Sequence, residues 1–235
     1  MFKWTPGAHT AVVTSPVDSR SYDAVIFDVG GVLTVNPFAM MAKLAQGHGI
    51  EPRTFVAIAV GAGSYGDGDH PWHIFERGEI TLDEYNSAIA ALARQHGLDG
   101  FPPLPPAEFM AQAMALRPEM IDAVDTVRAR GLRTAILTNN VSAWNSWRRF
   151  IPTEKFEVVI DSSDVGMRKP EARIYRLAVE RLGVSVDRCI FLDDLAANCA
   201  AAQALGMHAI LVDDSDAGRL ELLRLIASEQ RNQQP

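Results

Sequence analysis

The stretch Asp23-Ala24-Val25-Ile26-Phe27-Asp28-Val29-Gly30-Gly31 decides the fold of this 235-residue chain. Its apolar run, 24–27, has no polar interruption, which is typical of a strand that is covered on both faces within a parallel sheet. The strand ends on the carboxylate of Asp28, and a pair of glycines follows closely. We expect the backbone of this turn to require glycine at both Gly30 and Gly31.

Apolar strands of the same kind recur along the chain and alternate with helical patterns. They are expected at 133–138, 156–160, 189–193 and 208–212. Helical patterns fill 118–130, 170–182 and 196–205, and each ends before a glycine, which is a common stop signal. This alternation predicts an α/β fold with a doubly wound parallel sheet.

The segment between the first and second strands is much longer than a single crossover helix requires. Helices are expected near 38–48, 81–96 and 106–115, with breaks at the glycine-rich 61–68 and the proline-rich 101–106. Crossovers in such sheets begin above the carboxyl ends of the strands, where ligands bind. We therefore predict a flexible N-terminal arm (1–21), a core domain (22–36 and 116–235) and an inserted small α-helical cap domain (37–115).

The composition narrows the class of function. A formal net charge of -7 and the lack of a Lys/Arg cluster argue against nonspecific binding to nucleic acid. The apolar stretches are too short to span a bilayer, and the N-terminus lacks the pattern of a signal peptide. We expect a cytoplasmic protein with no nucleic-acid or membrane partner, whose two cysteines, Cys189 and Cys199, are buried thiols.

Polar residues mark the carboxyl ends of the expected strands or the segments that follow them. They are Asp28, Thr138 with Asn139, Lys169, and the pair Asp193-Asp194. Each suits phosphoryl transfer, in which an anion is held, its charge is neutralised and a nucleophile is aimed in line. A carboxylate can attack phosphorus, and carboxylates from separate strands repel each other unless a cation such as Mg²⁺ lies between them. Hydroxyl, amide and ammonium groups can hold the phosphate oxygens.

Four motifs in this order resemble those of the haloacid dehalogenase-like superfamily. They are 27–33 (FDVGGVL), 137–139 (LTN), 166–175 (GMRKPEARIY) and 191–194 (FLDD), the last followed by Asn198. The third has the form found in bacterial sugar-phosphate phosphatases and in the N-terminal phosphatase domain of soluble epoxide hydrolases. The resemblance covers residues 22 to about 213 and implies a Rossmann-like core in which the first strand lies beside the fourth.

The resemblance also implies a role for each motif residue. Asp28 would be the nucleophile and a metal ligand, and Lys169 would bridge the nucleophile and the phosphate, which Thr138 and Asn139 hold. The metal, Mg²⁺, would be bound by Asp28 and by Asp194 as the principal acidic ligand, with Asp193 secondary and the backbone carbonyl of Gly30 as a further ligand. We expect Asn198 to support the acidic pair through a hydrogen bond.

The first motif departs from the family pattern at Gly30. Most phosphatases of the family have Asp at this position, where it protonates the leaving oxygen and then activates water. General acid/base catalysis contributes about 10²- to 10⁴-fold, so its loss slows the reaction but leaves covalent and electrostatic catalysis in place. A good leaving group, water, or a cap residue such as His70 or His73 is expected to cover the deficit.

Three hypotheses about function follow. The leading one is a magnesium-dependent phosphohydrolase that acts on a small phosphorylated metabolite, with a sugar phosphate favoured by the third motif. The second, which Gly30 favours, is a catalytically weak or inactive module that binds phosphate or protein. The third is a haloacid dehalogenase, which needs no metal and is disfavoured by the acidic pair Asp193-Asp194.

Overall fold

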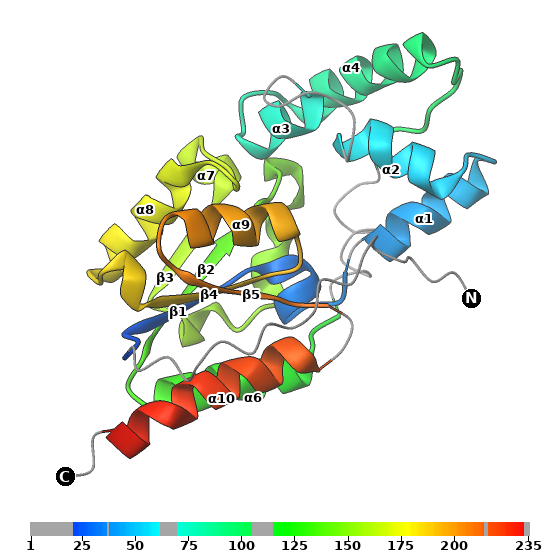
Figure 1. Cartoon of the computed structure of the whole chain (residues 1–235). Helices are drawn as coiled ribbons and strands as arrows, with labels where there is room; N and C mark the ends of the chain where they lie inside the picture. The colour runs from blue at the N-terminus through cyan, green and yellow to red at the C-terminus, as the bar shows by residue number, and fades with distance from the viewer. Residues whose placement is uncertain (1–20, 37, 62–69, 105–114, 214–215, 233–235) are drawn as a thin grey trace.

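A computed structural model describes residues 21–36, 38–61, 70–104, 115–213 and 216–232, and its centre is a five-stranded parallel sheet (Figure 1). The strands are β1 (Ala24–Phe27), β2 (Arg133–Thr138), β3 (Val158–Asp161), β4 (Cys189–Asp193) and β5 (His208–Leu211). Their order across the sheet is β3-β2-β1-β4-β5, and every neighbouring pair is parallel. The predicted doubly wound fold is confirmed, as is the position of the first strand beside the fourth.

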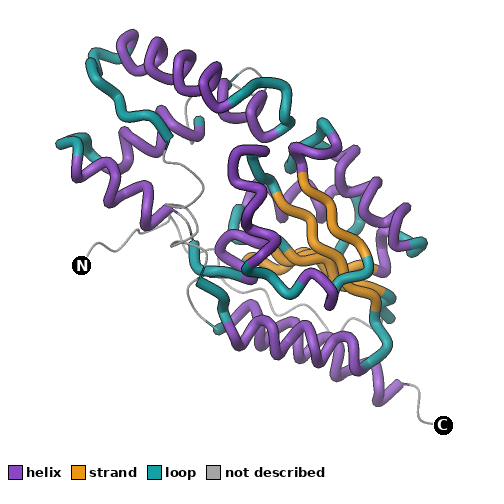
Figure 2. Tube along the Cα trace, turned by 180° about the vertical axis from the view of Figure 1, so that it is seen from behind, coloured by secondary structure: helices purple, strands orange, loops and turns teal. Residues whose placement is uncertain are grey.

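Helices cover both faces of the sheet, because successive strand side chains point to opposite faces. On one face, α6 (Pro118–Ala129) and α10 (Ala217–Asn232) pack against Val25 and Phe27 of β1. On the other face, α8 (Ala172–Leu182) and α9 (Ala196–Ala204) pack on the side to which Ala24 and Ile26 point. Figures 1 and 2 show these two layers from opposite sides. Among these helices, α10 was not predicted from the sequence.

The inserted segment forms a separate group of helices with its own hydrophobic cluster. These helices are α1 (Phe38–Gly47), α2 (Pro52–Val60), α3 (Pro71–Glu76) and α4 (Leu82–Gln95). The predictions at 38–48 and 81–96 are confirmed, whereas α2 and α3 were not predicted. The predicted helix at 106–115 lies outside the described residues except for Ala115, as does the predicted N-terminal arm except for Ser21. An isolated antiparallel bridge between Thr34 and Leu116 joins the two connections to the core.

Short helical segments complete the described chain. They are η1 (Val29–Leu33), η2 (Ser142–Arg149), η3 (Thr153–Lys155), α7 (Ser162–Val165) and η4 (Val186–Arg188). Both cysteines are buried and free, as predicted. Within the described ranges, no helix combines the length and the apolar character that crossing a membrane requires.

Candidate active site

The sheet places Asp28 and Asp193 next to each other at its carboxyl edge. Phe27 pairs with Leu192 in the parallel register of β1 and β4, so the residues that follow them emerge side by side. The backbone N–H of Asp28 donates to the Leu192 carbonyl at 2.9 Å, which extends the ladder by one residue. Both carboxylates are buried, Asp28 being 7% exposed and Asp193 0%.

The ammonium group of Lys169 lies between these two carboxylates. Its Nζ is 2.8 Å from Asp28 Oδ1 and 2.7 Å from Asp193 Oδ2, and the residue is fully buried. Burial alone would lower the pKa of Lys169, but the carboxylates of Asp193 and Asp28 outweigh burial and raise it. The lysine is therefore a fixed positive charge that holds the proposed nucleophile in one orientation.

Asp193 is fixed from several directions. Its Oδ1 accepts the backbone N–H of Leu195 at 2.8 Å, and the Asn198 side chain donates to Oδ1 at 2.9 Å and to Oδ2 at 3.1 Å. The predicted support of the acidic pair by Asn198 is thus confirmed. The Tyr175 hydroxyl in turn donates to the Asn198 carbonyl at 3.0 Å. With its oxygens used in this way, Asp193 acts as the anchor of Lys169 more than as an open ligand.

Asp194 completes a group of three carboxylates. One carboxylate oxygen from each of Asp28, Asp193 and Asp194 lies within 4.8 Å of the others. Burial, together with the charges of Asp28 and Asp193, raises the pKa of Asp194 to about 8. Burial also raises the pKa of Asp28 to about 6, although Lys169 opposes this shift. Three carboxyl groups and one ammonium group thus form a site that is short of positive charge.

These residues fit a divalent cation of the magnesium type. Hard oxygen donors grouped at this spacing are the ligands that Mg²⁺ prefers, and such a cation would offset both the burial and the neighbouring charges that raise the pKa of Asp194. Asp194 is half-buried and Asp193 is fully buried, and the ranking of Asp194 before Asp193 as a metal ligand stays a prediction. The ligand assignment of the Gly30 carbonyl remains a prediction.

The two glycines of the first motif differ in conformation. Gly31 has φ of 75°, and a Cβ at this position would lie 2.4 Å from Asp194 Oδ2, so only glycine fits. Gly30 has φ of -67° and ψ of 126°, which any residue adopts. The prediction that the backbone requires glycine at both positions is confirmed for Gly31 and wrong for Gly30. The backbone dihedrals at Gly30 therefore do not explain why this chain lacks a carboxylate there.

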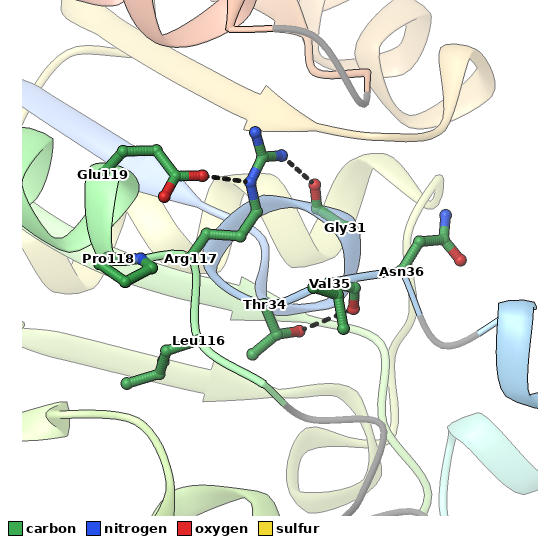
Figure 3. A pocket seen from close by; sticks show the side chains of 8 residues that line it. All are labelled: Gly31, Thr34, Val35, Asn36, Leu116, Arg117, Pro118 and Glu119. Atoms are coloured by element: carbon green, nitrogen blue, oxygen red, sulfur yellow. Dashed lines mark hydrogen bonds and ion pairs between the residues drawn. The ribbon is translucent and has the colours of Figure 1, made fainter.

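A pocket of about 350 Å³ lies at the two connections to the cap and is lined by residues 31, 34–36 and 116–119 (Figure 3). Asn36, in its lining, donates from Nδ2 to Asp194 Oδ2 at 2.8 Å. Figure 3 shows the Arg117 guanidinium between the Gly31 carbonyl, at 3.2 Å, and the Glu119 carboxylate, at 3.0 Å. The two connections to the cap thus hold two parts of the site: Arg117 binds the turn after Asp28, and Asn36 binds the carboxylate of Asp194.

The second motif contributes in two different ways. Thr138 is 5% exposed at the end of β2, and its hydroxyl makes no hydrogen bond with another described residue. The side chain of Asn139 instead clamps the backbone of Lys169, accepting from its N–H at 2.8 Å and donating to its carbonyl at 3.0 Å. The predicted phosphate contact of Asn139 would therefore come from its backbone, while its side chain positions the lysine.

Asp161, at the end of β3, is a site residue that the sequence analysis missed. It is 1% exposed and lies opposite Thr138 in the sheet register. Its Oδ2 accepts from Asn140 at 2.8 Å, from Trp147 Nε1 at 3.1 Å and from Arg148 at 3.1 Å. The signal was present, because Asp161 directly follows the predicted strand 156–160 and so shares the carboxyl edge with Asp28.

The cap contributes a buried ion pair that the sequence analysis also missed. Glu76, at the end of α3, accepts from Arg168 Nε at 2.6 Å, and its side chain is 7% exposed. His70 caps the same helix by accepting the Trp72 N–H on Nδ1 at 3.1 Å, and burial lowers its pKa. His73 lies on α3 with its ring centroid 5.6 Å from that of His70. The suggestion that either histidine replaces the missing acid/base group remains a prediction.

Comparison with known proteins identifies the family. The sequence model of the haloacid dehalogenase-like hydrolase family matches residues 22–206. This match confirms the resemblance that the four motifs indicated. Among curated relatives, mouse acyl-CoA dehydrogenase family member 10 is 34% identical over 88% of this chain. Rat bifunctional epoxide hydrolase 2 is 27% identical over 86% of it. The chain spans 19% and 38%, respectively, of the lengths of these two relatives.

Two further proteins match over nearly their full length. A sesquiterpene phosphatase of Aspergillus oryzae is 29% identical over 88% of this chain and 97% of its own length. A solved structure of a haloacid dehalogenase family enzyme from Bacteroides thetaiotaomicron, in complex with magnesium and inorganic phosphate, has a TM-score of 0.55 and 20% identity. The match covers 81% of this chain and 94% of that one. At this identity, the structural likeness supports the fold.

Proposed function

The chain belongs to the haloacid dehalogenase-like hydrolases, and we propose that it is a magnesium-dependent phosphatase acting on a small phosphorylated metabolite. The observation that carries the proposal is Lys169, which lies between Asp28 and Asp193 beside a third carboxylate. A buried nucleophile is held here by an ammonium group and lies next to a cation site. This arrangement fits an enzyme that attacks an anion better than it fits a protein that only binds one.

The reaction would proceed in two displacements. A carboxylate oxygen of Asp28 attacks the phosphorus of the ester, the phosphorus–oxygen bond to the leaving group breaks, and the leaving oxygen takes a proton from water. Water then attacks the phosphorus of the aspartyl phosphate, which releases inorganic phosphate, a proton and the free carboxylate. Lys169 and the hydroxyl of Thr138 hold the phosphate oxygens during both steps.

Magnesium, bound by Asp28, Asp194, Asp193 and the Gly30 carbonyl, would neutralise the negative charge that these residues and the phosphate bring together. Asn36 would orient Asp194 for this purpose, since it holds one of its oxygens. Because Gly30 offers no carboxyl group, the leaving oxygen depends on water for its proton. We therefore propose that substrates with good leaving groups turn over fastest.

The names of relatives support the phosphatase proposal. The Aspergillus relative is a phosphatase and matches over nearly its full length. The Bacteroides structure contains magnesium and inorganic phosphate. A sugar phosphate remains our first choice of substrate class, based on the form of residues 166–175.

Hydrolysis of an aryl phosphate with and without magnesium tests the proposal. We expect magnesium-dependent release of phosphate, and Asp28→Asn should abolish it, because the amide is not a nucleophile of comparable strength. Asp99→Asn, which changes an exposed carboxylate in the cap, is the matched control and should leave the rate unchanged. Full activity of Asp28→Asn would overturn the nucleophile assignment.

One observation, Gly30, favours a second candidate: a module that binds phosphate without turnover. Thermal stabilisation by phosphorylated metabolites distinguishes the two functions. Stabilisation without phosphate release across a broad panel would favour the binding module, whereas release from any member of the panel favours the enzyme.

A further inference from the structure

The end of α3 is seated against the part of the core that carries Lys169. We call residues 76–79 the cap turn. A Cβ at Gly78 would lie 2.5 Å from the Ser163 carbonyl, which shows how closely the two backbones approach. Arg77 Nη1 lies 3.9 Å from Glu171, two residues beyond Lys169. The cap turn therefore packs on α7 and on the end of the loop between α7 and α8.

A second ion pair across this contact, shorter than that of Arg77 and Glu171, joins Glu76 to Arg168. Glu76 Oε2 lies 2.6 Å from Arg168 Nε, and the two side chains are 7% and 16% exposed. Burial raises the pKa of Glu76, while the Arg168 guanidinium and a hydrogen bond from Trp72 oppose the shift. A buried carboxylate of this kind is stable as an anion only with its partner, because an unpaired buried charge is costly. The pair therefore links α3 to Arg168 when the cap is packed on the core.

Arg168 directly precedes Lys169, and Lys169 is fixed from the other side by Asn139. The Asn139 side chain binds both the N–H and the carbonyl of Lys169. The loop that carries the lysine is thus held between a core residue at the end of β2 and a cap residue at the end of α3. A displacement of the loop would move Nζ away from Asp28 and Asp193, which lie only 2.8 and 2.7 Å away.

We infer that Glu76 is a positioning residue for Lys169: through Arg168, it makes the orientation of the catalytic lysine depend on seating of the cap. The inference rests on the proposed function for its catalytic consequence. It also has a consequence that needs no activity, since loss of the pair should loosen residues 166–171. Substrate that favours the seated cap would then favour the ordered lysine as well.

A double-mutant cycle tests this role, using Glu76→Gln, Arg168→Met and the two combined. Each single change leaves one buried charge unpaired and should lower Tm. The double variant has no unpaired charge, so we expect it to recover most of the Tm. It should still show a kcat that is lower by about ten- to a hundredfold, because a small misplacement of a catalytic group has effects of this size. Its KM should change less than its kcat.

Amide hydrogen exchange provides the readout that does not require turnover. Residues 166–171, including the Lys169 N–H that Asn139 accepts, should exchange faster in the double variant than in the natural protein. Arg224→Gln is the matched control. It breaks the pair of Arg224 with Glu221 on α10, away from the loop, and these side chains are 55% and 38% exposed. We expect no change in kcat, Tm or exchange of the loop in this variant.

Two results would overturn the inference. If kcat recovers together with Tm in the double variant, the ion pair serves stability alone. If exchange of 166–171 is unchanged, the loop does not depend on Glu76. Absence of phosphate release from the natural protein would instead overturn the proposed function, and the exchange measurement would still decide the positioning role.

Discussion

The carboxyl edge of the sheet and the helical cap hold their charged groups by different means. At the sheet edge, Lys169 contacts two carboxylates, and Asp193 is bound in addition by Asn198 and by the Leu195 backbone. In the cap, Glu76 depends on Arg168 and Trp72 within a cluster of aromatic rings, where Phe75 stacks on Tyr85 at 5.0 Å. The strand backbones thus fix the positions of the charged groups at the sheet edge, whereas the packing of the cap helices fixes the position of Glu76.

Among changes that compare the sheet edge with the rest of the molecule, the largest effect is expected where the sheet-edge network loses the ammonium group of Lys169. Lys169→Met should lower kcat by about 10²- to 10³-fold, because one preorganised group that stabilises the developing charge is lost. The free energy of unfolding should fall by about 3–5 kcal/mol at neutral pH, since buried carboxylates lose their partner. Steady-state kinetics and urea unfolding measure the two effects.

Lys155→Met is the control for that variant. Lys155 pairs with Asp125 at 2.5 Å, but these side chains are 25% and 47% exposed, so the loss should be about 0–1 kcal/mol. If the two changes lower the free energy of unfolding equally, the buried ion pairs of Lys169 stabilise the fold no more than an exposed pair does.

The contrast between the two regions also explains what the sequence could predict. Carboxyl ends of parallel strands meet at one edge, and the strand order that the family resemblance implied was enough to bring Asp28 and Asp194 together. Asp161 obeys the same rule, because it ends β3 at the same edge of the sheet. The pair of Glu76 and Arg168 is different, because no periodicity links residues in a helical insertion to a loop of the core.

The missed helices have local reasons. Helix α2 begins after Glu51, whose side chain accepts the Thr54 N–H at 2.8 Å, although Glu is not among the favoured residues at this position. Helix α3 spans only Pro71–Glu76, which is too short to show a helical period. Both are stabilised by burial in the cap cluster, which contains Phe55 and Phe75, and such packing is not visible in a local pattern.

A smaller effect is expected from adding the carboxylate that the sheet edge lacks. The dihedral angles of Gly30 accept any residue, so Gly30→Asp should fold. If water alone supplies the proton, the variant should hydrolyse alkyl phosphates about a hundredfold faster, which is the lower end of the range for general acid/base catalysis. Aryl phosphates with good leaving groups should gain less. The two substrate classes are compared by kcat/KM.

Gly30→Asn separates the acid/base role from the effect of a larger side chain. It should not accelerate hydrolysis of alkyl phosphates, since an amide does not transfer a proton at neutral pH. No gain from Gly30→Asp would instead indicate that a cap residue already acts as the acid. The cap would then contribute a catalytic group as well as the sheet edge.

The smallest effect concerns stability as a function of pH. The folded pKa of Asp194, about 8, lies above the ordinary value of 3.8, so the folded state binds more protons than the unfolded state between these values. The pKa of Asp28, about 6, acts in the same direction. Without magnesium, the contribution of these two carboxyl groups to stability is therefore fully present below the ordinary value of 3.8, and it declines as pH rises from there through the folded values of about 6 and 8. Magnesium competes with these protons, so its stabilising effect should grow over the same interval.

Thermal unfolding at pH 5.5 and 8.5, with chelator or with magnesium, measures this linkage. We expect the increase in Tm on addition of magnesium to be larger at pH 8.5. In Asp194→Asn, the decline without magnesium should be shallower, because the group with the largest shift no longer titrates. Asp164→Asn, at an exposed carboxylate on α7, should retain the decline of the natural protein. A Tm without magnesium that rises between pH 6 and 8 would contradict the charge balance assigned to the sheet edge, since repulsion among its carboxylates can only grow as they ionise.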